Sequence, residues 1–187
     1  MANYSIRLIG DPVLRSRSTE VTDINDNLKQ LVDGMISTMK LAPGVGLAAP
    51  QVGVLKRVFV YDVGDGPHVV INPVIRQSSG EWEYEEGCLS VPGFSWRIVR
   101  PNHVHLCGYD LDENEVDIEA SEFLGRVIQH EVDHLDGILL VERLEPDVRK
   151  EAMRMLRKQF LISDEGGSPT GSRSNSSIPV VSKSGIL

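Results

Sequence analysis

Apolar residues recur along this chain with two different periods, and the places where the period changes predict the order of its elements. Over Asp23–Lys40 they recur every three or four residues, which indicates an amphipathic helix. Ser121–Asp136 repeats this period, begins with a residue type that caps helices and precedes a glycine that would end one. A third helix is predicted over residues 146–162, because proline at its start suits a first helical turn.

Between the first two helices the pattern changes to that of strands. Arg57–Val63 and His68–Asn72 are rich in β-branched and aromatic residues, and the glycine-containing segment between them predicts a hairpin. Further strands are expected at Trp96–Val99, Val104–Tyr109 and Glu115–Glu119. Because the strands cluster rather than alternate with helices, we expect an α+β fold. Mostly antiparallel sheets would pack around the central helix, with an N-terminal and a C-terminal helix beside them.

The composition narrows the class of protein. Of 187 residues, 41% are hydrophobic, which is enough for a folded core and excludes a wholly disordered chain. The apolar runs fall far short of the ~20 residues that a membrane helix needs, so no membrane partner is expected. The first residues lack the apolar segment of a secretion signal, and two cysteines are too few for a disulfide scaffold. We therefore expect a cytoplasmic protein.

Charge is distributed unevenly along the chain. Its net value of −8 argues against nucleic acid as the main ligand. Residues 146–162 nevertheless carry an excess of basic side chains, namely Arg149, Lys150, Arg154, Arg157 and Lys158. Residues 163–187 are rich in serine and glycine, and we expect a flexible tail there. The chain is thus predicted to comprise a folded domain at residues 1–145, a basic C-terminal helix and a tail.

The second predicted helix contains the pattern H-E-x-x-H, at residues 130–134. Residues four apart on a helix lie one above the other, so His130 and His134 can both reach one metal ion. The carboxylate of Glu131 could then face a metal-activated water molecule, accept its proton and return it to a leaving group. The alternative is a solvated helix face on which two histidines occur by chance.

A catalytic metal needs a third protein ligand beside the two imidazoles, and an open position for water. Downstream, Leu140 stands where metzincins place a third histidine, which excludes that arrangement. Glu142 and Glu145 follow the helix too closely to be convincing ligands. We therefore look for the third ligand upstream of the helix.

Two upstream candidates contain cysteine. Cys88 follows Gly87, which lets the backbone approach a metal closely, and a thiolate is a strong ligand for a borderline-soft ion. The alternative for Cys88 is a small buried hydrophobic residue. The other candidate is a row on one strand face, formed by His103, His105 and Cys107. For this row we favour an ordinary strand with Val104 and Leu106 pointing inward.

The chain resembles the peptide deformylase family in three separated motifs. They are Gly44–Gln51 (GVGLAAPQ), Glu86–Ser90 (EGCLS) and Gln129–Leu135 (QHEVDHL), in the order that the family has them. Gly10–Arg15 (GDPVLR) is also similar to a segment near the start of that family. The likeness covers roughly residues 6–145, and it implies that this part of the chain is a deformylase-like catalytic domain.

The resemblance implies a role for each matching residue. One divalent metal would be held by three side chains, Cys88, His130 and His134. Glu131 would be the general acid/base, while the Gln51 amide and the backbone N–H of Leu89 would donate hydrogen bonds to the developing oxyanion. Each preorganised donor at such an oxygen is worth about 3–4 kcal/mol. The family implies Fe²⁺ in the cell, although Zn²⁺, Ni²⁺ and Co²⁺ also accept two imidazoles and a thiolate.

The implied reaction is hydrolytic removal of the formyl group from the N-terminal formylmethionine of nascent polypeptides, with release of formate. Gly44 and Gly46 would let the backbone approach an extended peptide; they can also be turn residues after the first helix, and both can hold together. An apolar pocket for the methionine side chain would be lined by Val45, Leu89 and Val127. Arg126 departs from the apolar pocket wall usual in the family, and we expect its side chain to reach the rim of the pocket.

The surroundings of this site allow two further expectations. Glu86 is expected to pair with Arg100 and so to position Cys88, whereas most of the acidic run at residues 81–86 would be solvated. The basic helix could dock on the ribosome, or it could be a solvated face without a partner. We expect the protein itself to be a monomer.

Two other functions remain as alternatives. One is a different metallo-amidase or peptidase on the same scaffold. The other is a non-catalytic metal-binding protein, which would need a closed site with four protein ligands and no general base. Only three ligands can be named in this sequence, beside an intact Glu131, so the open catalytic site is favoured.

Overall fold

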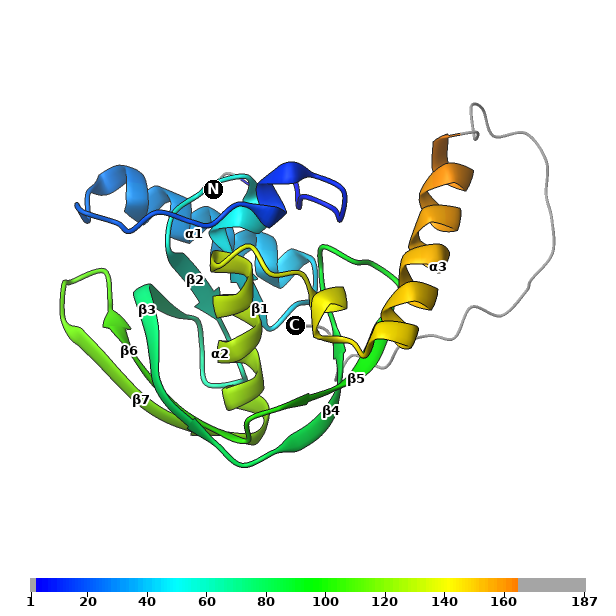
Figure 1. Cartoon of the computed structure of the whole chain (residues 1–187). Coiled ribbons are helices and arrows are strands. Elements are labelled where there is room, and N and C mark those ends of the chain that lie inside the picture. Colours follow the sequence, from blue (N-terminus) through cyan, green and yellow to red (C-terminus); the bar gives the residue numbers. More distant parts are fainter. Residues whose placement is uncertain (1–2, 165–187) are drawn as a thin grey trace.

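The computed structural model describes residues 3–164, which form three α-helices, three 3-10 helices and seven strands (Figure 1). The α-helices are α1 (Asp26–Leu41), α2 (Glu122–Leu135) and α3 (Pro146–Asp164). The 3-10 helices are η1 (Pro12–Arg15), η2 (Ala49–Val52) and η3 (Leu140–Arg143). The strands are β1 (Gly46–Ala48), β2 (Val58–Tyr61), β3 (His68–Ser79), β4 (Trp82–Gly87), β5 (Ser95–Arg100), β6 (His103–Tyr109) and β7 (Glu115–Ser121). The predicted α+β fold is confirmed.

Five strands form one antiparallel sheet in the order β1-β2-β3-β6-β7. The predicted hairpin is confirmed, because β2 pairs with β3 and Val58 lies opposite Ile71. β3 continues to Ser79, further than expected, because Pro73 and the polar residues after it conceal the strand pattern. Val104 and Leu106 on β6 point inward as predicted and are buried in the core beside α2.

Strands β4 and β5 form a separate two-stranded sheet. β4 was not predicted as a strand, because its sequence is dominated by glutamates. Its residues nevertheless alternate between two faces, with Glu83 and Glu85 exposed and Glu86 buried. The expected solvation of this acidic run is therefore confirmed for Glu83 and Glu85, and the buried Glu86 is the exception that places a carboxylate in the core.

Helix α1 covers one side of the molecule. It begins at Asp26, three residues later than expected, because the Asn25 side chain caps it by accepting a hydrogen bond from the Leu28 backbone N–H at 3.1 Å. Its apolar face is buried in one core cluster together with residues of β1 and β2. The helix thereby stabilises β1, which lies within the first motif.

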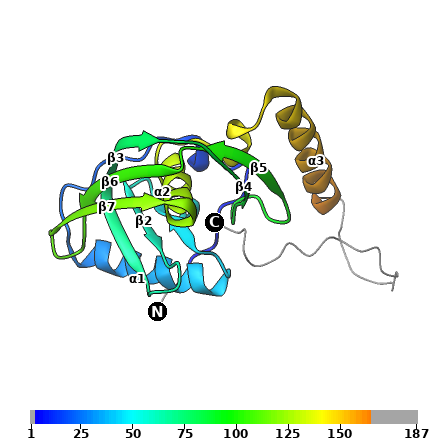
Figure 2. The ribbon, with the colours of Figure 1, turned by 90° about the horizontal axis from the view of Figure 1, so that it is seen from below.

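Helix α2 runs through the middle of the molecule, with α1 on one side and strands β3, β6 and β7 on the other (Figure 1). Figure 2 shows the same helix from below, with β4 and β5 beside it. All eleven residues from Gly125 to Leu135 are buried. Gly137 follows with a φ of +74°, which allows the chain to leave the helix in a left-handed turn. The predicted central helix is confirmed, and its polar motif lies in the core.

Helix α3 begins at Pro146 as expected and contacts the body through the buried side chains of Ala152 and Leu156. It extends to Asp164, two residues beyond its expected end. The remainder of the predicted tail, residues 165–187, lies outside the described residues. None of the helices within residues 3–164 has a stretch that is both long and apolar enough to span a bilayer.

Candidate functional site

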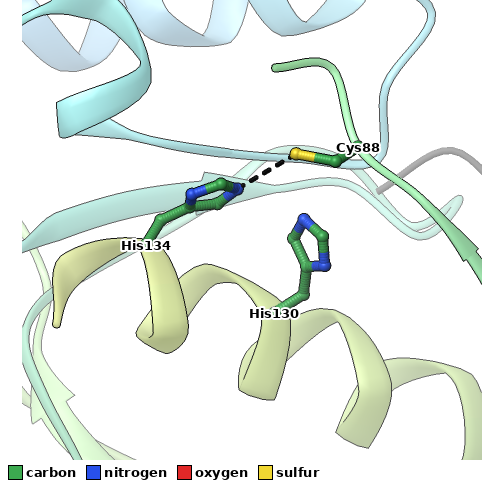
Figure 3. Close-up of side chains that lie close together, drawn as sticks. All are labelled: Cys88, His130 and His134. Carbon is green, nitrogen blue, oxygen red and sulfur yellow. Dashed lines mark hydrogen bonds between the residues drawn. The ribbon is translucent and has the colours of Figure 1, made fainter. Parts of the chain in front are cut away.

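Three side chains converge where the end of β4 meets α2 (Figure 3). Cys88 directly follows β4, while His130 and His134 project from successive turns of α2. One donor atom from each of them lies within 4.8 Å of the other two, and Cys88 Sγ lies 3.2 Å from His134 Nε2. All three residues are at least 97% buried. The helix spacing predicted that the histidines share a face, and the tertiary structure adds Cys88 to them.

Several polar atoms at this point have no hydrogen-bond partner among the described residues. They are His130 Nε2, His134 Nδ1 and both carboxylate oxygens of Glu131. Buried polar atoms are nearly always paired, and exceptions of this kind commonly mark an ion or a functional site. A thiol and two imidazoles are the donors that a borderline-soft divalent ion such as Zn²⁺ or Fe²⁺ accepts. These residues therefore fit a metal ion, with Glu131 beside it.

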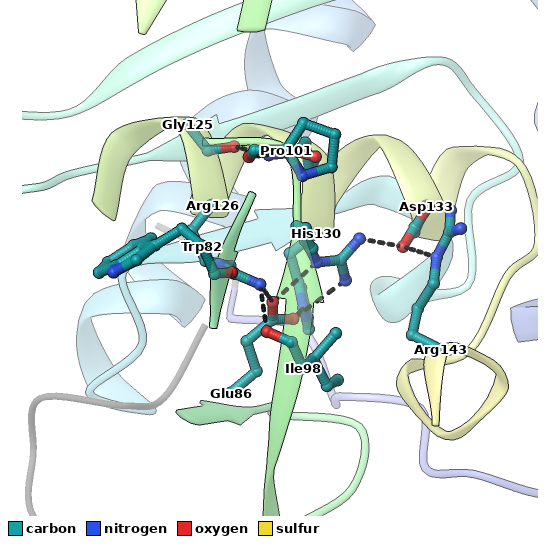
Figure 4. A network of polar contacts seen from close by, with 11 residues as sticks. Trp82, Glu86, Ile98, Pro101, Gly125, Arg126, His130, Asp133 and Arg143 are labelled. Atoms are coloured by element: carbon teal, nitrogen blue, oxygen red, sulfur yellow. Dashed lines mark hydrogen bonds and ion pairs between the residues drawn. The ribbon is translucent and has the colours of Figure 1, made fainter. Parts of the chain in front are cut away.

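The Glu86 carboxylate connects this site to a network of charged residues (Figure 4). Its Oε2 atom lies 3.2 Å from His130 Nδ1. Arg100 donates hydrogen bonds to both of its oxygens, at 2.7 and 3.0 Å, so the predicted Glu86–Arg100 pair is confirmed. An Nδ1–H bonded to a carboxylate leaves Nε2 of the same ring with its lone pair free to bind a metal. Glu86 thus orients the ring of His130, whereas the sequence had suggested that it positions Cys88.

Arg126 corrects one of our predictions. Its side chain does not reach the rim of a pocket: the residue is 99% buried and lies on the side of α2 that faces β4 and β5. It donates hydrogen bonds to Glu86 Oε1 at 2.8 Å, to the Ile98 carbonyl at 2.9 Å and to the Trp82 carbonyl. Its guanidinium also lies over the Trp82 ring, 5.2 Å from the centroid. The expectation was wrong because a buried anion and two strand carbonyls accept hydrogen bonds from the two terminal nitrogens of the guanidinium in the core.

Asp133 extends the same network to the surface, and sequence reasoning missed it. It accepts hydrogen bonds from Arg100 at 2.7 Å and from Arg143 of η3 at 2.9 Å. A signal was present in the spacing, since Arg126, His130 and Asp133 stand four and three residues apart and so share one helix face. A buried row of Arg, His and Asp on one helix indicates a shared partner, which is the β4–β5 sheet here.

Gln51 lies within reach of the metal-binding candidates. Its Oε1 atom accepts a hydrogen bond from the Ala48 backbone N–H at 2.8 Å. Its Nε2 donates to Ser90 Oγ at 3.2 Å and contacts Cys88 Sγ at 3.7 Å. The side chain is therefore held at one end by the backbone, and its amide donor points toward Cys88. The first and second motifs, far apart in the sequence, meet at this residue.

The two glycines of the first motif contact the other two motifs. A Cβ atom added at Gly46 would lie 2.2 Å from Glu131 Oε1, and one added at Gly44 would lie 2.7 Å from the Leu89 side chain. Only glycine at position 46 allows β1 to pass so close to the carboxylate. Gly46 lies in β1, so its reading as a turn residue was wrong.

The chain matches the family model for polypeptide deformylase over residues 3–150. It belongs to that family. A peptide deformylase of Agathobacter rectalis is 53% identical over 145 residues, which cover 78% of this chain and 92% of the relative. A peptide deformylase of Acidothermus cellulolyticus is 47% identical over 158 residues, which cover 84% of this chain and 88% of the relative. The predicted enzyme class, a hydrolase of the deformylase family, is confirmed.

Solved deformylase structures share the fold. The crystal structure of a peptide deformylase from Legionella pneumophila has a TM-score of 0.82 and 37% identity, and covers 89% of this chain and 100% of its own. The deformylase of Ehrlichia chaffeensis in complex with actinonin has a TM-score of 0.81 and 38% identity, and covers 85% of this chain and 98% of its own. The likeness extends over nearly the whole length of these family members.

The residues predicted to line an apolar pocket lie around the deformylase motifs but in two different core clusters. Val127 is fully buried in the cluster between α2 and the five-stranded sheet, and Val45 packs against that cluster while remaining partly exposed. Leu89 packs against the other cluster, which includes α1. Val45 and Leu89 are thus the two candidates with exposed surface, whereas Val127 is buried in the cluster against which Val45 packs.

Burial and mutual contact shift the pKa values of the deformylase site. Burial raises the pKa of the Cys88 thiol, but the charges of His134 and His130 outweigh burial and lower it to about 5. Burial lowers the pKa of His130, whereas Cys88 and Glu86 raise it to about 10. Burial raises the pKa of Glu131 to about 7, against the opposing charges of the two histidines. The thiolate is the metal-binding form of cysteine, and the neighbouring histidines favour that form of Cys88.

Proposed function

We propose that this enzyme hydrolyses the N-formyl group of formylmethionine at the N-terminus of nascent polypeptides and releases formate. One divalent metal would be bound by Cys88, His130 and His134. The observation that carries the proposal is the meeting of these three donors with the carboxylate of Glu131, whose oxygens have no hydrogen-bond partner within residues 3–164. A closed structural metal site would have no use for such a carboxylate.

The choice of metal follows from the donor set. Two imidazoles and a thiolate accept Fe²⁺, Zn²⁺, Ni²⁺ or Co²⁺, and the resemblance to deformylases favours Fe²⁺ in the cell. When bound, the metal supplies Lewis-acid activation of a water molecule. The chain contributes the rest of the chemistry, since it orients the ligands, moves the proton and stabilises the developing charge.

Glu131 would act as the general acid/base. Burial raises its pKa to about 7, so that near neutral pH the carboxylate can take a proton and return it to the leaving amine nitrogen. Gly46 keeps the space beside its Oε1 atom free of a side chain. The carboxylate, which projects from α2, can therefore face the scissile amide of a substrate bound along β1.

Gln51 and the backbone N–H of Leu89 would stabilise the oxyanion that forms from the formyl oxygen. The amide nitrogen of Gln51 carries two hydrogens, and its contact with Cys88 Sγ at 3.7 Å is the weaker of its two contacts. We infer that the amide hydrogen on the Cys88 side is donated to the oxyanion, while the hydrogen bond to Ser90 holds the Gln51 side chain in place. Such a donor contributes about 3–4 kcal/mol to transition-state stabilisation.

Strand β1 would bind the substrate backbone. It is the first strand of the five-stranded sheet, so its outer edge can pair with an extended peptide. Gly44, Val45 and Gly46 lie at this edge or directly before it, and Gly46 contacts Glu131. The formylmethionine side chain would then lie against the apolar residues Val45, Leu89 and Val127. This arrangement supports a linear peptide as the substrate.

The basic side of α3 supports a ribosomal partner. The five basic residues of the helix named above are all exposed, and they line one hollow along it. Exposed guanidinium and ammonium groups can contact the phosphates of ribosomal RNA. The deformylase domain of residues 1–145 would then be carried to nascent chains in the cytoplasm as a monomer. Unchanged co-sedimentation with ribosomes after substitution of Arg154, Arg157 and Lys158 by glutamate would exclude this docking.

The test of the reaction is formate release from formyl-Met-Ala-Ser, with the metal analysed after anaerobic purification. Glu131→Ala should retain the metal but lose about 10²-fold or more in rate, as expected for a missing acid/base. Actinonin, which is bound in the Ehrlichia relative, should inhibit the wild-type enzyme. Equal hydrolysis of acetyl-Met-Ala-Ser would instead indicate another metallo-amidase, and near-wild-type turnover of Glu131→Ala would contradict the mechanism.

A further inference from the structure

A second group of metal-ligand residues lies on the outer face of the five-stranded sheet, away from α2. His105 and Cys107 project from β6, and Asp117 projects from β7. Cys107 and Asp117 are directly paired in the antiparallel register, and His105 is two residues before Cys107 on the same face. The sequence offered His103, His105 and Cys107 as one candidate set of metal ligands but favoured an ordinary strand face, and it gave no sign of Asp117, which comes from another strand.

The distances within this group suit a shared cation. His105 Nε2 lies 2.8 Å from Asp117 Oδ1, and Cys107 Sγ lies 3.7 Å from His105 Nε2 and 3.9 Å from Asp117 Oδ2. In a tetrahedral zinc site the metal–ligand lengths place neighbouring donor atoms about 3.3–3.6 Å apart. The two distances that end on His105 Nε2, 2.8 and 3.7 Å, are each within about half an ångström of the value that one bound ion would impose, and either oxygen of Asp117 lies close enough to be the third donor. Side-chain rotations alone can make up that difference.

The backbone that carries these residues is held on both sides. β6 pairs with β3 on one edge and with β7 on the other, so the positions of His105 and Cys107 are set by two ladders of hydrogen bonds. Asp117 is held by the second of these ladders. Sites built on strands are positioned more accurately than sites built on loops. The three donors therefore need little ordering before they bind an ion.

The group is open to solvent and its surroundings are mainly acidic. The side chains of His105 and Asp117 are 27% and 68% exposed. Cys107 and Asp117 line a surface hollow of about 380 Å³ that also contains Glu20, Glu115 and Arg76. Carboxylates on this face favour the approach of a cation, and Arg76 offsets only part of their charge.

We propose that His105, Cys107 and Asp117 form a second metal site, which binds a borderline divalent cation such as Zn²⁺ through sulfur, nitrogen and oxygen. Three protein ligands leave the fourth position to water, as in an open zinc site. The site is separate from the candidate catalytic centre, because its ligands lie on the opposite side of the sheet from α2. The enzyme would accordingly bind two equivalents of Zn²⁺ or Co²⁺.

The two cysteines of the chain make the test direct, since each belongs to one of the two sites. In the full-length Cys88→Ser variant, any thiolate–Co²⁺ charge-transfer absorption must come from Cys107. Titration with Co²⁺ should produce this near-ultraviolet band and saturate at one equivalent. Adding Cys107→Ser should abolish the band, and Asp117→Asn should weaken binding about 10-fold or more. His103→Ala changes a histidine on the same strand face outside the group, so it should leave the titration unchanged.

The wild-type enzyme provides a second measurement that does not depend on the folding of Cys88→Ser. It should bind two equivalents of Zn²⁺, and Cys107→Ser should bind one while releasing formate at the wild-type rate. The proposal is overturned if Cys88→Ser is folded by circular dichroism and shows no thiolate–Co²⁺ band. It is also overturned if Cys107→Ser binds as much metal as the wild type. Loss of formate release on Cys88→Ser tests the catalytic centre separately.

Discussion

The two faces of the β4–β5 sheet hold similar ion pairs in opposite environments. On the inner face, Glu86 is completely buried and is hydrogen-bonded to Arg100, Arg126 and His130. On the outer face, Glu83 pairs with Arg97 at 3.0 Å while its side chain remains 52% exposed. Glutamate–arginine ion pairs therefore occur both buried and exposed to solvent, at two positions that are three residues apart on β4. Desolvation makes the inner network both costly to disrupt and able to orient a metal ligand, and the outer pair can do neither.

The largest effect is expected from Glu86→Gln. The substitution preserves shape but leaves Arg126 as a buried cation without an anion, while Arg100 keeps only Asp133. Loss of one partner of a buried pair costs about 3–5 kcal/mol. It also removes the acceptor that orients His130, and such partners change metal affinity or activity by about 10–100-fold. Urea unfolding and formate release would measure the two effects. If the free energy of unfolding fell by less than about 1 kcal/mol, the buried ion pairs of the inner face would contribute no more than the exposed pair of the outer face.

Arg126→Met should have the next largest effect. The Ile98 and Trp82 carbonyls would lose their donor in the core, which costs about 1–3 kcal/mol per unsatisfied group. Glu86 would keep Arg100 and His130, so metal content should change less than in Glu86→Gln. Unfolding midpoints and metal analysis of the two variants side by side test this ranking. If Arg126→Met loses more metal than Glu86→Gln, the guanidinium rather than the carboxylate orients His130.

Acid should affect the two faces differently. Burial by itself would raise the pKa of Glu86, but its hydrogen bonds to His130 and Arg100 hold that pKa far below the ordinary value of 4.5. A group with a lowered folded-state pKa contributes stability that is present above its unfolded value and is lost as the pH falls toward the folded one. Below about pH 4.5 the wild type should therefore lose stability more steeply than Glu86→Gln. Parallel pH profiles of unfolding free energy for the two proteins would contradict this prediction.

The smallest effect is expected on the outer face. Glu83→Gln removes an exposed ion pair, and such pairs contribute about 0–1 kcal/mol, with less at high salt. Unfolding free energy, metal content and formate release should all stay close to the wild-type values. Because Glu83 and Glu86 lie on the same strand, this variant is the matched control for the other three predictions. A large loss of stability would mean that the exposed pair is part of the buried network.

The sequence predicted those features of the fold that depend on local spacing. Helices α1 and α2 and the β2–β3 hairpin follow from the period of apolar residues, which neighbouring positions along the chain decide. Strand β4 was missed because glutamates occupy both of its faces, although Trp82, Tyr84 and Glu86 alternate correctly. β1 was missed because it has only three residues, which are too few to show the alternation of apolar and polar positions that is typical of a strand.

The residues of the candidate site likewise fall into two groups, those predicted from local spacing and those placed by the tertiary structure. The sequence by itself determined that His130 and His134 share a helix face with Glu131 beside them, because residues four apart on any helix are neighbours. Only the tertiary structure decided that Glu86 and two backbone carbonyls of β4 and β5 lie against that helix, where they pair with Arg126. The burial of a charge depends on partners contributed by three separate elements, and no local period encodes them. For this reason Arg126 was expected at the rim of a pocket and lies in the core, hydrogen-bonded to the carboxylate that orients a metal ligand.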